Sequence, residues 1–141
     1  RVVVTGMGAL TPIGNNLQDY WKGLVDGVSG AGLITHFDTS KFKTRFACEI
    51  KNYDPANYFD RKESRKMDRY SQYAHVAADE AVKDAGLDPE ATDKDRSGVI
   101  WASGIGGIET ILEEVKGFVT GDGTPRFSPF FIQKMISDIS A

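Results

Sequence analysis

An uninterrupted run of β-branched residues opens the chain, where residues 1–8 read RVVVTGMG. Val2–Thr5 show no alternation with polar residues, and Gly6 and Gly8 supply a sharp turn behind the run. A run without alternation is typical of a strand that is buried on both faces, as in a sheet with helices on each side. We therefore predict a buried strand over residues 1–5.

A second run of this kind, GVIWA, covers residues 98–102 and leads into the glycine-rich turn SGIGG at residues 103–107. Elsewhere apolar residues recur at helical spacing. These patterns predict helices over about residues 16–27, 62–85 and 108–119, a short strand over residues 46–50, a loop over residues 121–125 and a final helix opened by Ser128–Pro129. Strands that alternate with amphipathic helices indicate an α/β domain with a largely parallel sheet.

Helix start and stop signals support these boundaries. Asn15 or Asn16 can cap the first helix, and Gly27 can end it. Gly86 supplies the stop for the long helix. Small side chains line one stripe of that long helix, which predicts that a neighbouring backbone packs closely against it; they are Ala74, Ala77, Ala78, Ala81 and Ala85.

Length and composition narrow the class of protein. The 141 residues suffice for one domain with a core, and the apolar share of 40% with a charged share of 26% is ordinary for a soluble globular protein. A net charge of −3 argues against a general nucleic-acid binder. No stretch approaches the roughly 18 apolar residues of a membrane helix, and no signal-peptide pattern opens the chain. We expect a cytoplasmic protein without a membrane partner.

The residues that most often carry catalysis are few. Cys48 is the only cysteine, so no intrachain disulfide can form. Its apolar surroundings, without a nearby histidine or helix N-terminus, predict a packing residue and not a reactive thiol. His36 and His75 lie far apart without partners at metal spacing, and we expect both to be structural. No arrangement of nucleophile, base and oxyanion donors can be assembled from these residues.

Two glycine-rich turns invite a ligand. The first resembles a dinucleotide fingerprint, but Thr11 stands where the third glycine is needed and Pro12 follows it, which favours a structural turn. The second, Ser103–Gly107, has two interpretations: a ligand site at the C-terminal end of a parallel strand, or glycines needed only for a tight turn. Ile105, the lone apolar residue among these glycines, either faces a pocket or fills the core.

A basic group occupies the beginning of the predicted long helix, at a spacing that gives one positive face: Arg61, Lys62, Arg65, Lys66 and Arg69. Positive charge near a helix N-terminus opposes the helix dipole, and Glu63 and Asp68 offset part of it. A solvated charged face and a docking site for an acidic or phosphate-bearing partner are both compatible with this pattern.

Several segments, in this order along the chain, resemble one family. These are VVVTGMG at residues 2–8, TPIGN at residues 11–15, RKMDR at residues 65–69, DAGL at residues 84–87, SGIGG at residues 103–107 and SPFF at residues 128–131. Together they resemble the β-ketoacyl-[acyl-carrier-protein] synthases, in particular the type II elongating enzymes. The resemblance covers essentially the whole chain.

The resemblance implies the N-terminal part of a thiolase-like fold, in which α and β layers alternate as αβαβα around mostly parallel sheets and two chains pair as a homodimer. It implies an acyltransferase of fatty-acid elongation, which forms a thioester on a cysteine and condenses the acyl group with malonyl-[acyl-carrier-protein] after decarboxylation. No cofactor is expected to be bound, because the substrates travel on the phosphopantetheine arm of acyl carrier protein.

Residues 1–141 would then be an incomplete N-terminal domain. The chain begins with Arg1 and not with Met, and it ends without a helix stop signal, so we expect both ends to be cut. The nucleophilic cysteine and both catalytic histidines are expected beyond Ala141, and Cys48 does not match the nucleophile. The 141-residue segment alone is expected to be inactive.

Site residues follow from the resemblance position by position. Ile105 matches a residue that lines the acyl-chain pocket, and Phe131 lies where the family builds the pocket near the dimer interface. The residues that match the docking surface for the acidic carrier protein are Lys62, Arg65 and Lys66, with Arg126 near a second such position.

The resemblance is incomplete at Gln133 and Asp138, which replace a common proline and a common asparagine. A non-catalytic alternative, a chain-length-factor-like or polyketide-pathway partner, stays open. A nucleotide-binding domain is a weaker third interpretation. Acyl chain-length preference is not predicted from these residues.

Overall fold

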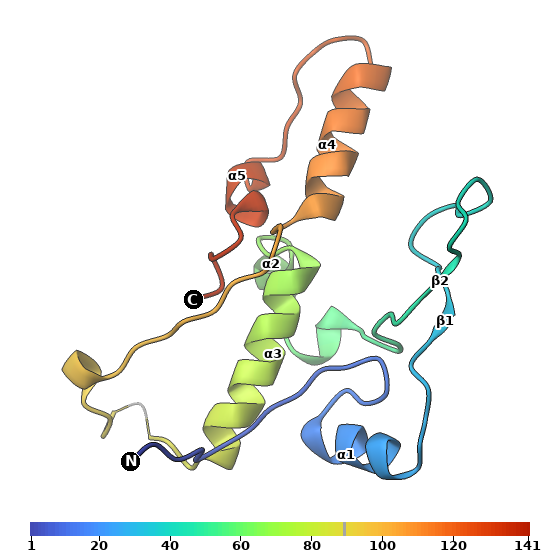
Figure 1. Ribbon diagram of the computed structural model, residues 1–141. Coiled ribbons are helices and arrows are strands. Elements are labelled where there is room, and N and C mark those ends of the chain that lie inside the picture. The colour runs from blue at the N-terminus through green and yellow to red at the C-terminus, as the bar shows by residue number, and fades with distance from the viewer. Residues whose placement is uncertain (89) are drawn as a thin grey trace. The chain divides into compact units, whose positions relative to one another are not determined.

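The computed structural model describes residues 1–88 and 90–141, and Figure 1 labels its main helices and strands. The chain divides into two compact units: the first comprises Arg1–Tyr53 and Val76–Leu87, and the second comprises Asp54–His75 and Asp88–Ala141. No helix in the described part of the chain is long and apolar enough to cross a membrane. The elements in chain order are α1 (Leu17–Val25), β1 (Gly32–Leu33), β2 (Phe46–Ala47), η1 (Pro55–Asn57), α2 (Arg61–Ser64), α3 (Arg69–Asp84), η2 (Lys94–Arg96), α4 (Ile108–Thr120) and α5 (Phe131–Met135).

In the first unit, the turn after the opening run lies directly on helix α3. A Cβ atom built on Gly8 would lie 2.0 Å from the Ala77 carbonyl oxygen, and one on Gly6 would lie 2.3 Å from that of Ala81. Only glycine permits such an approach of two backbones. The predicted close packing on the alanine stripe is therefore confirmed, and it accounts for both glycines without a bound ligand.

Two carboxylates of α3 hold this segment in place. The backbone N–H of Met7 donates to Asp84 Oδ2 at 2.9 Å. Glu80 accepts twice, from the N–H of Ala9 at 2.8 Å and from the N–H of Leu17 at 2.8 Å. Because Leu17 is the first residue of α1, Glu80 satisfies a donor that a helix N-terminus leaves unpaired.

Helix α1 has the predicted boundaries. Asn16 is the cap, and its side chain accepts from the backbone N–H of Asp19. Gly27 has φ of +65°, a left-handed conformation that ends the helix and favours glycine. A short antiparallel pair follows, with Gly32 opposite Ala47 and Leu33 opposite Phe46. The strand predicted over residues 46–50 is thus formed only at Phe46–Ala47.

The two runs predicted as buried strands are corrected by the structure. Residues 1–5 and 98–102 form no strand, and Val2 is 98% exposed and Ile100 is 99% exposed. The sheet formed by the described residues is the two-stranded antiparallel pair, and not a parallel one. A buried strand needs hydrogen-bonded neighbours and a layer of side chains on each face. These two runs lack both within the described residues.

The long helix predicted over residues 62–85 is also corrected, because it is broken into α2 and α3 at residues 65–68. At the break, the Gln72 amide donates to the carbonyl oxygens of Ser64 at 3.0 Å and Met67 at 3.3 Å. The Asp68 side chain accepts from the Tyr70 N–H at 3.4 Å, which starts a new helix. The predicted stop at Gly86 is confirmed by its φ of +62°.

In the second unit, aromatic side chains connect α4 to the segment that follows it. Phe118 of α4 lies 5.7 Å from Phe127, and Phe127 stacks on Phe131 of α5 at 5.4 Å, measured between ring centroids. The carboxylate of Glu114 accepts from the Ser128 N–H at 3.2 Å. Helix α4 confirms the helix predicted over residues 108–119. The final helix begins at Phe131 and not at Ser128–Pro129.

Candidate functional site

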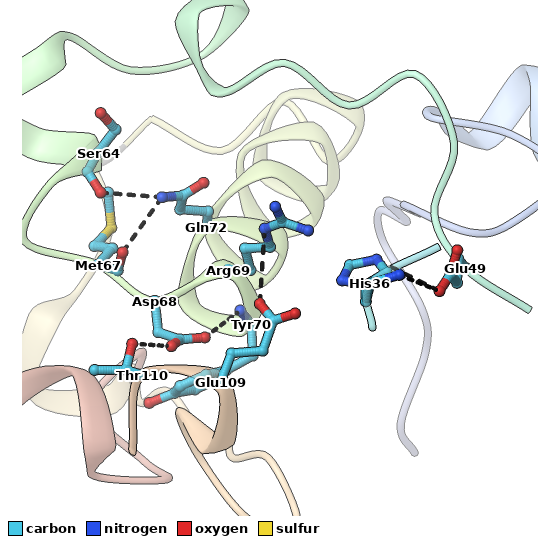
Figure 2. Close-up of polar contacts among 10 residues, drawn as sticks. All are labelled: His36, Glu49, Ser64, Met67, Asp68, Arg69, Tyr70, Gln72, Glu109 and Thr110. Carbon is cyan, nitrogen blue, oxygen red and sulfur yellow. Dashed lines mark hydrogen bonds and ion pairs between the residues drawn. The ribbon is translucent and has the colours of Figure 1, made fainter. Parts of the chain in front are cut away.

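An exposed group of positive side chains lies in α2 and the turn behind it, and we call it the basic cluster: Arg61, Lys62, Arg65 and Lys66. It differs from the single helical face predicted from the sequence, because the helix is broken at residues 65–68 and Arg69 belongs to α3. Figure 2 shows Arg69 beside Glu109, at 3.8 Å. The part of the chain that the structure describes contains no ion pair to a member of the basic cluster.

The local charges leave the basic cluster positive. Asp60 caps α2 and accepts from the backbone N–H groups of Lys62 at 2.6 Å and Glu63 at 2.8 Å, so its carboxylate is turned toward the helix end. Four positive side chains on six consecutive positions then face solvent beside one glutamate. Exposed charge of one sign attracts a partner of opposite charge and steers its approach.

Arg126 differs from the basic cluster, because it has a partner in its own loop. Its guanidinium lies 2.9 Å from Asp122 Oδ2, with side-chain exposures of 74% and 58%. Hydrogen bonds from Thr124 and then from Arg126 hold the pKa of the Asp122 carboxyl below its ordinary value. Part of the Arg126 charge is therefore neutralised by Asp122.

The turn Ser103–Gly107, which we call the glycine loop, is held by hydrogen bonds at both of its ends. The Ser103 hydroxyl accepts from the Gly106 N–H at 2.5 Å, and the Ser103 N–H donates to the Ser137 carbonyl at 2.9 Å. A Cβ atom would lie 2.1 Å from the Met135 carbonyl oxygen at Gly106 and 2.2 Å from that of Lys134 at Gly107. The close approach to α5 accounts for these two glycines.

The two predicted pocket residues both belong to the second unit, as do all the predicted docking residues. Ile105 is 69% exposed at the tip of the glycine loop, so it does not fill the core of this unit. Phe131 is half-buried at the start of α5, stacked on Phe127. Their roles in an acyl pocket stay predictions. Lys66 lines a cavity of about 360 Å³ together with Phe59, Glu63, Met67, Ser71, His75, Gln133 and Ile139.

Sequence reasoning missed a polar network between α3 and α4. The Thr110 hydroxyl donates to Asp68 Oδ2 at 2.5 Å, and Figure 2 shows Asp68 between Thr110 and Tyr70. Close by, burial raises the pKa of the Tyr73 phenol; Arg69 opposes this shift and Glu109 adds to it. An Asp before a helix start is a recognisable cap signal. It was hidden here because the apolar spacing continued across the break.

The structure shows the surroundings of the cysteine and of one histidine that the sequence predicted to be structural. Cys48 is exposed, so the predicted packing role is wrong. His36 lies 3.8 Å from Glu49, which also accepts from the backbone N–H and hydroxyl of Thr35. Figure 2 shows the His36–Glu49 pair. Among the described residues, no group of three His, Cys, Asp or Glu side chains could hold a metal ion.

Solved structures with the same fold define the class of protein. A beta-ketoacyl synthase from Burkholderia phymatum matches with a TM-score of 0.77 and 28% identity, over 100% of this chain and 35% of its own. The ishigamide ketosynthase/chain length factor matches with a TM-score of 0.73 and 32% identity, over 94% of this chain and 33% of its own. A third match has a TM-score of 0.75 and 26% identity, over 96% of this chain and 36% of its own. That structure is a type II polyketide acyl-carrier protein in complex with its ketosynthase bound to the hexaketide. The predicted fold class, the N-terminal part of the thiolase-like α/β fold, is confirmed.

Sequence comparisons then identify the family. The model of the beta-ketoacyl synthase N-terminal domain matches residues 1–141, and the chain belongs to this family. Two proteins named 3-oxoacyl-[acyl-carrier-protein] synthase 2 are similar to it: the Synechocystis sp. protein is 45% identical over 141 residues, and that of Staphylococcus aureus is 47% identical over 140 residues. The two matches include 100% and 99% of this chain, but the chain spans only 34% of the length of each relative.

Proposed function

We propose that the chain is the N-terminal part of an acyltransferase of fatty-acid elongation, a 3-oxoacyl-[acyl-carrier-protein] synthase. The observation that carries this proposal is the identity of 45–47% with two synthases of that name over essentially the whole chain. In the proposed reaction, an acyl thioester on a cysteine accepts the carbanion that malonyl-[acyl-carrier-protein] generates by losing CO2. The products are the 3-oxoacyl-[acyl-carrier-protein], CO2 and the free thiol. The cysteine and two histidines that perform these steps are expected outside residues 1–141.

The proposed part of this segment in the reaction is twofold. The basic cluster docks the acidic carrier protein, and this is supported by its exposure and its lack of internal ion pairs in the described chain. Ile105 and Phe131 contribute to the wall of the acyl pocket. The related ketosynthase that was solved with an acyl-carrier protein supports a carrier protein as the partner class.

The proposal has further consequences for the whole protein. We place it in the cytoplasm as a homodimer, without nucleic-acid or membrane partners. Decarboxylation and thioester exchange transfer no electrons to an external acceptor, so the proposed reaction needs no bound redox cofactor. The acyl groups reach the site on the phosphopantetheine arm of the carrier protein.

A second candidate function is a non-catalytic partner subunit of the polyketide type. It is favoured by one observation, the match at 32% identity to a ketosynthase/chain length factor. Such a subunit would keep the docking and pocket surfaces of this segment but would lack the nucleophile.

One assay on the full-length protein that carries this chain separates the two candidates. It is supplied with acyl-[acyl-carrier-protein] and malonyl-[acyl-carrier-protein], and mass spectrometry follows the 3-oxoacyl product while released CO2 is counted. Product with an equal amount of CO2 is the expected result. Carrier-protein binding without either product would support the partner subunit, and the absence of both binding and product would overturn the proposal.

Replacing Ile105 with phenylalanine is expected to block long acyl chains and to spare short ones. A larger side chain at the exposed tip of the glycine loop shortens the space beside it, and a pocket resolves about one methylene with a 10- to 200-fold difference in rate. The measurement is kcat/KM of the full-length enzyme for acyl groups of increasing length. Leu33→Phe, at a 78% exposed position of β1, is the matched control. Equal use of all lengths by the Ile105 variant would show that Ile105 lies outside the pocket.

A further inference from the structure

Asp68 is a buried carboxylate that the docking and pocket roles leave unused. It is 9% exposed, although only Met67 separates it from Lys66 of the exposed basic cluster. Its Oδ2 atom accepts the hydroxyl of Thr110 at 2.5 Å, and its Oδ1 atom accepts the N–H of Tyr70 at 3.4 Å. A buried carboxylate is costly unless such bonds satisfy it, so Thr110 and Asp68 depend on each other.

The same carboxylate also borders the glycine loop. A Cβ atom built on Gly107 would lie 2.8 Å from Asp68 Oδ2, and Gly107 itself is buried. The carbonyl oxygen of Lys134 limits the same glycine at 2.2 Å. Gly107 is therefore enclosed between the start of α3 and the end of α5.

Thr110 transmits this constraint along the chain. It lies in the first turn of α4, and that turn is anchored to the loop by the bonds from the Ile108 N–H to the Gly106 carbonyl at 2.9 Å and from the Ile111 N–H to the Gly107 carbonyl at 3.0 Å. Fixing Thr110 to Asp68 thus fixes the point where the glycine loop enters α4. Ile105 is exposed and sits one residue before this anchored part, so the loop backbone sets its position.

We propose that the Asp68–Thr110 hydrogen bond is a positioning pair that holds the glycine loop in place and thereby sets the acyl chain-length selectivity exerted by Ile105. This inference rests on the proposed function for its substrate, whereas the holding of the loop stands on the contacts alone. Neither residue touches the acyl group; both act through the loop.

The test uses three variants of the full-length protein. Thr110→Val keeps the shape of the side chain and removes the hydroxyl, and Thr110→Ser keeps the hydroxyl. Thr120→Val is the matched control, because the Thr120 hydroxyl donates to the Lys116 carbonyl of its own helix at 2.8 Å. Two quantities are measured: hydrogen–deuterium exchange of the peptide that covers residues 103–107, and the ratio of kcat/KM for a long and a short acyl group.

Thr110→Val is expected to speed exchange in the glycine loop about tenfold, the size that corresponds to losing a hydrogen bond to a charged group. The ratio of long to short acyl use is expected to shift about three- to tenfold. Thr110→Ser and Thr120→Val should both leave the exchange rate and the ratio of long to short acyl use at the wild-type values.

Two results would overturn parts of this inference, and a third would bear on the proposed function. Wild-type exchange in Thr110→Val would show that the pair does not hold the loop. Faster exchange with an unchanged ratio would show that the loop does not set selectivity. A wild-type protein that makes no 3-oxoacyl product would refute the proposed function instead, and the exchange experiment would still decide whether the pair holds the loop.

Discussion

Reversing the charge of Lys62, Arg65 and Lys66 to glutamate is expected to weaken binding of an acidic carrier protein about 100-fold. Each exposed charge contact is worth up to about 1 kcal/mol, and three reversals replace attraction with repulsion at three positions. The cluster is solvent-exposed, so its interaction is screened by salt. Titration calorimetry at several salt concentrations would show the wild-type affinity falling as salt rises, and a much flatter dependence for the triple variant.

A matched control separates this effect from overall charge. The triple variant Lys41→Glu, Lys43→Glu, Lys51→Glu changes the net charge equally, at exposed positions of the first unit. We expect it to keep most of the wild-type affinity. Equal losses in both variants, or unchanged affinity in the basic-cluster variant, would remove the docking role.

Arg126→Glu is expected to weaken carrier binding less than any single reversal in the basic cluster. Asp122 lies 2.9 Å from the Arg126 guanidinium and already offsets part of its charge. Asp122→Asn removes that competition and is expected to raise the affinity a few-fold. The same titrations measure both variants, and an Arg126 effect equal to that of Lys62 would contradict the expected order.

Gly8→Ala is expected to destabilise the protein by about 3 kcal/mol or more. Its Cβ atom would lie 2.0 Å from the Ala77 carbonyl oxygen and 2.8 Å from the Ala81 nitrogen, and neither backbone atom can rotate away. Overpacking of this kind costs about 1–3 kcal/mol. Moving the segment to make room would also strain the bonds from Met7 to Asp84 and from Ala9 to Glu80, each worth about 1.5–3 kcal/mol.

Urea unfolding followed by circular dichroism measures this loss. Gly117→Ala is the matched control, because Gly117 lies inside α4 and a Cβ atom there meets nothing within 4 Å. Alanine favours a helix over glycine by about 1 kcal/mol, so this variant should gain stability. Equal effects of the two substitutions would show that the turn does not lie against α3 as described.

The helix ends at Asn16, Gly27 and Gly86 were predictable from the sequence, because the forces that set them act over a few residues. The Asn16 side chain caps α1 by accepting from the backbone N–H of Asp19, and the predicted stops at Gly27 and Gly86 both have left-handed conformations. The family was predictable for a related reason. Its motifs are short, contiguous and ordered along the chain, and the match over residues 1–141 confirms them.

The break in the long helix could not be predicted in the same way. Apolar residues keep helical spacing from Met67 to Ala85, so the pattern runs across Asp68 without interruption. Asp68 is instead satisfied by Thr110, 42 positions further along the chain. A pattern read over one or two helical turns contains no information about such a partner.

The candidate site shows the same division between local and distant causes. The basic cluster could be predicted from local composition, because its four positive side chains lie within six consecutive positions of the sequence. The enclosure of Gly107 and the exposure of Cys48 were decided only by tertiary structure. The two valine-rich runs show the reason most clearly: β-branched residues favour a strand, but a strand forms only where another segment supplies its hydrogen bonds and covers its side chains.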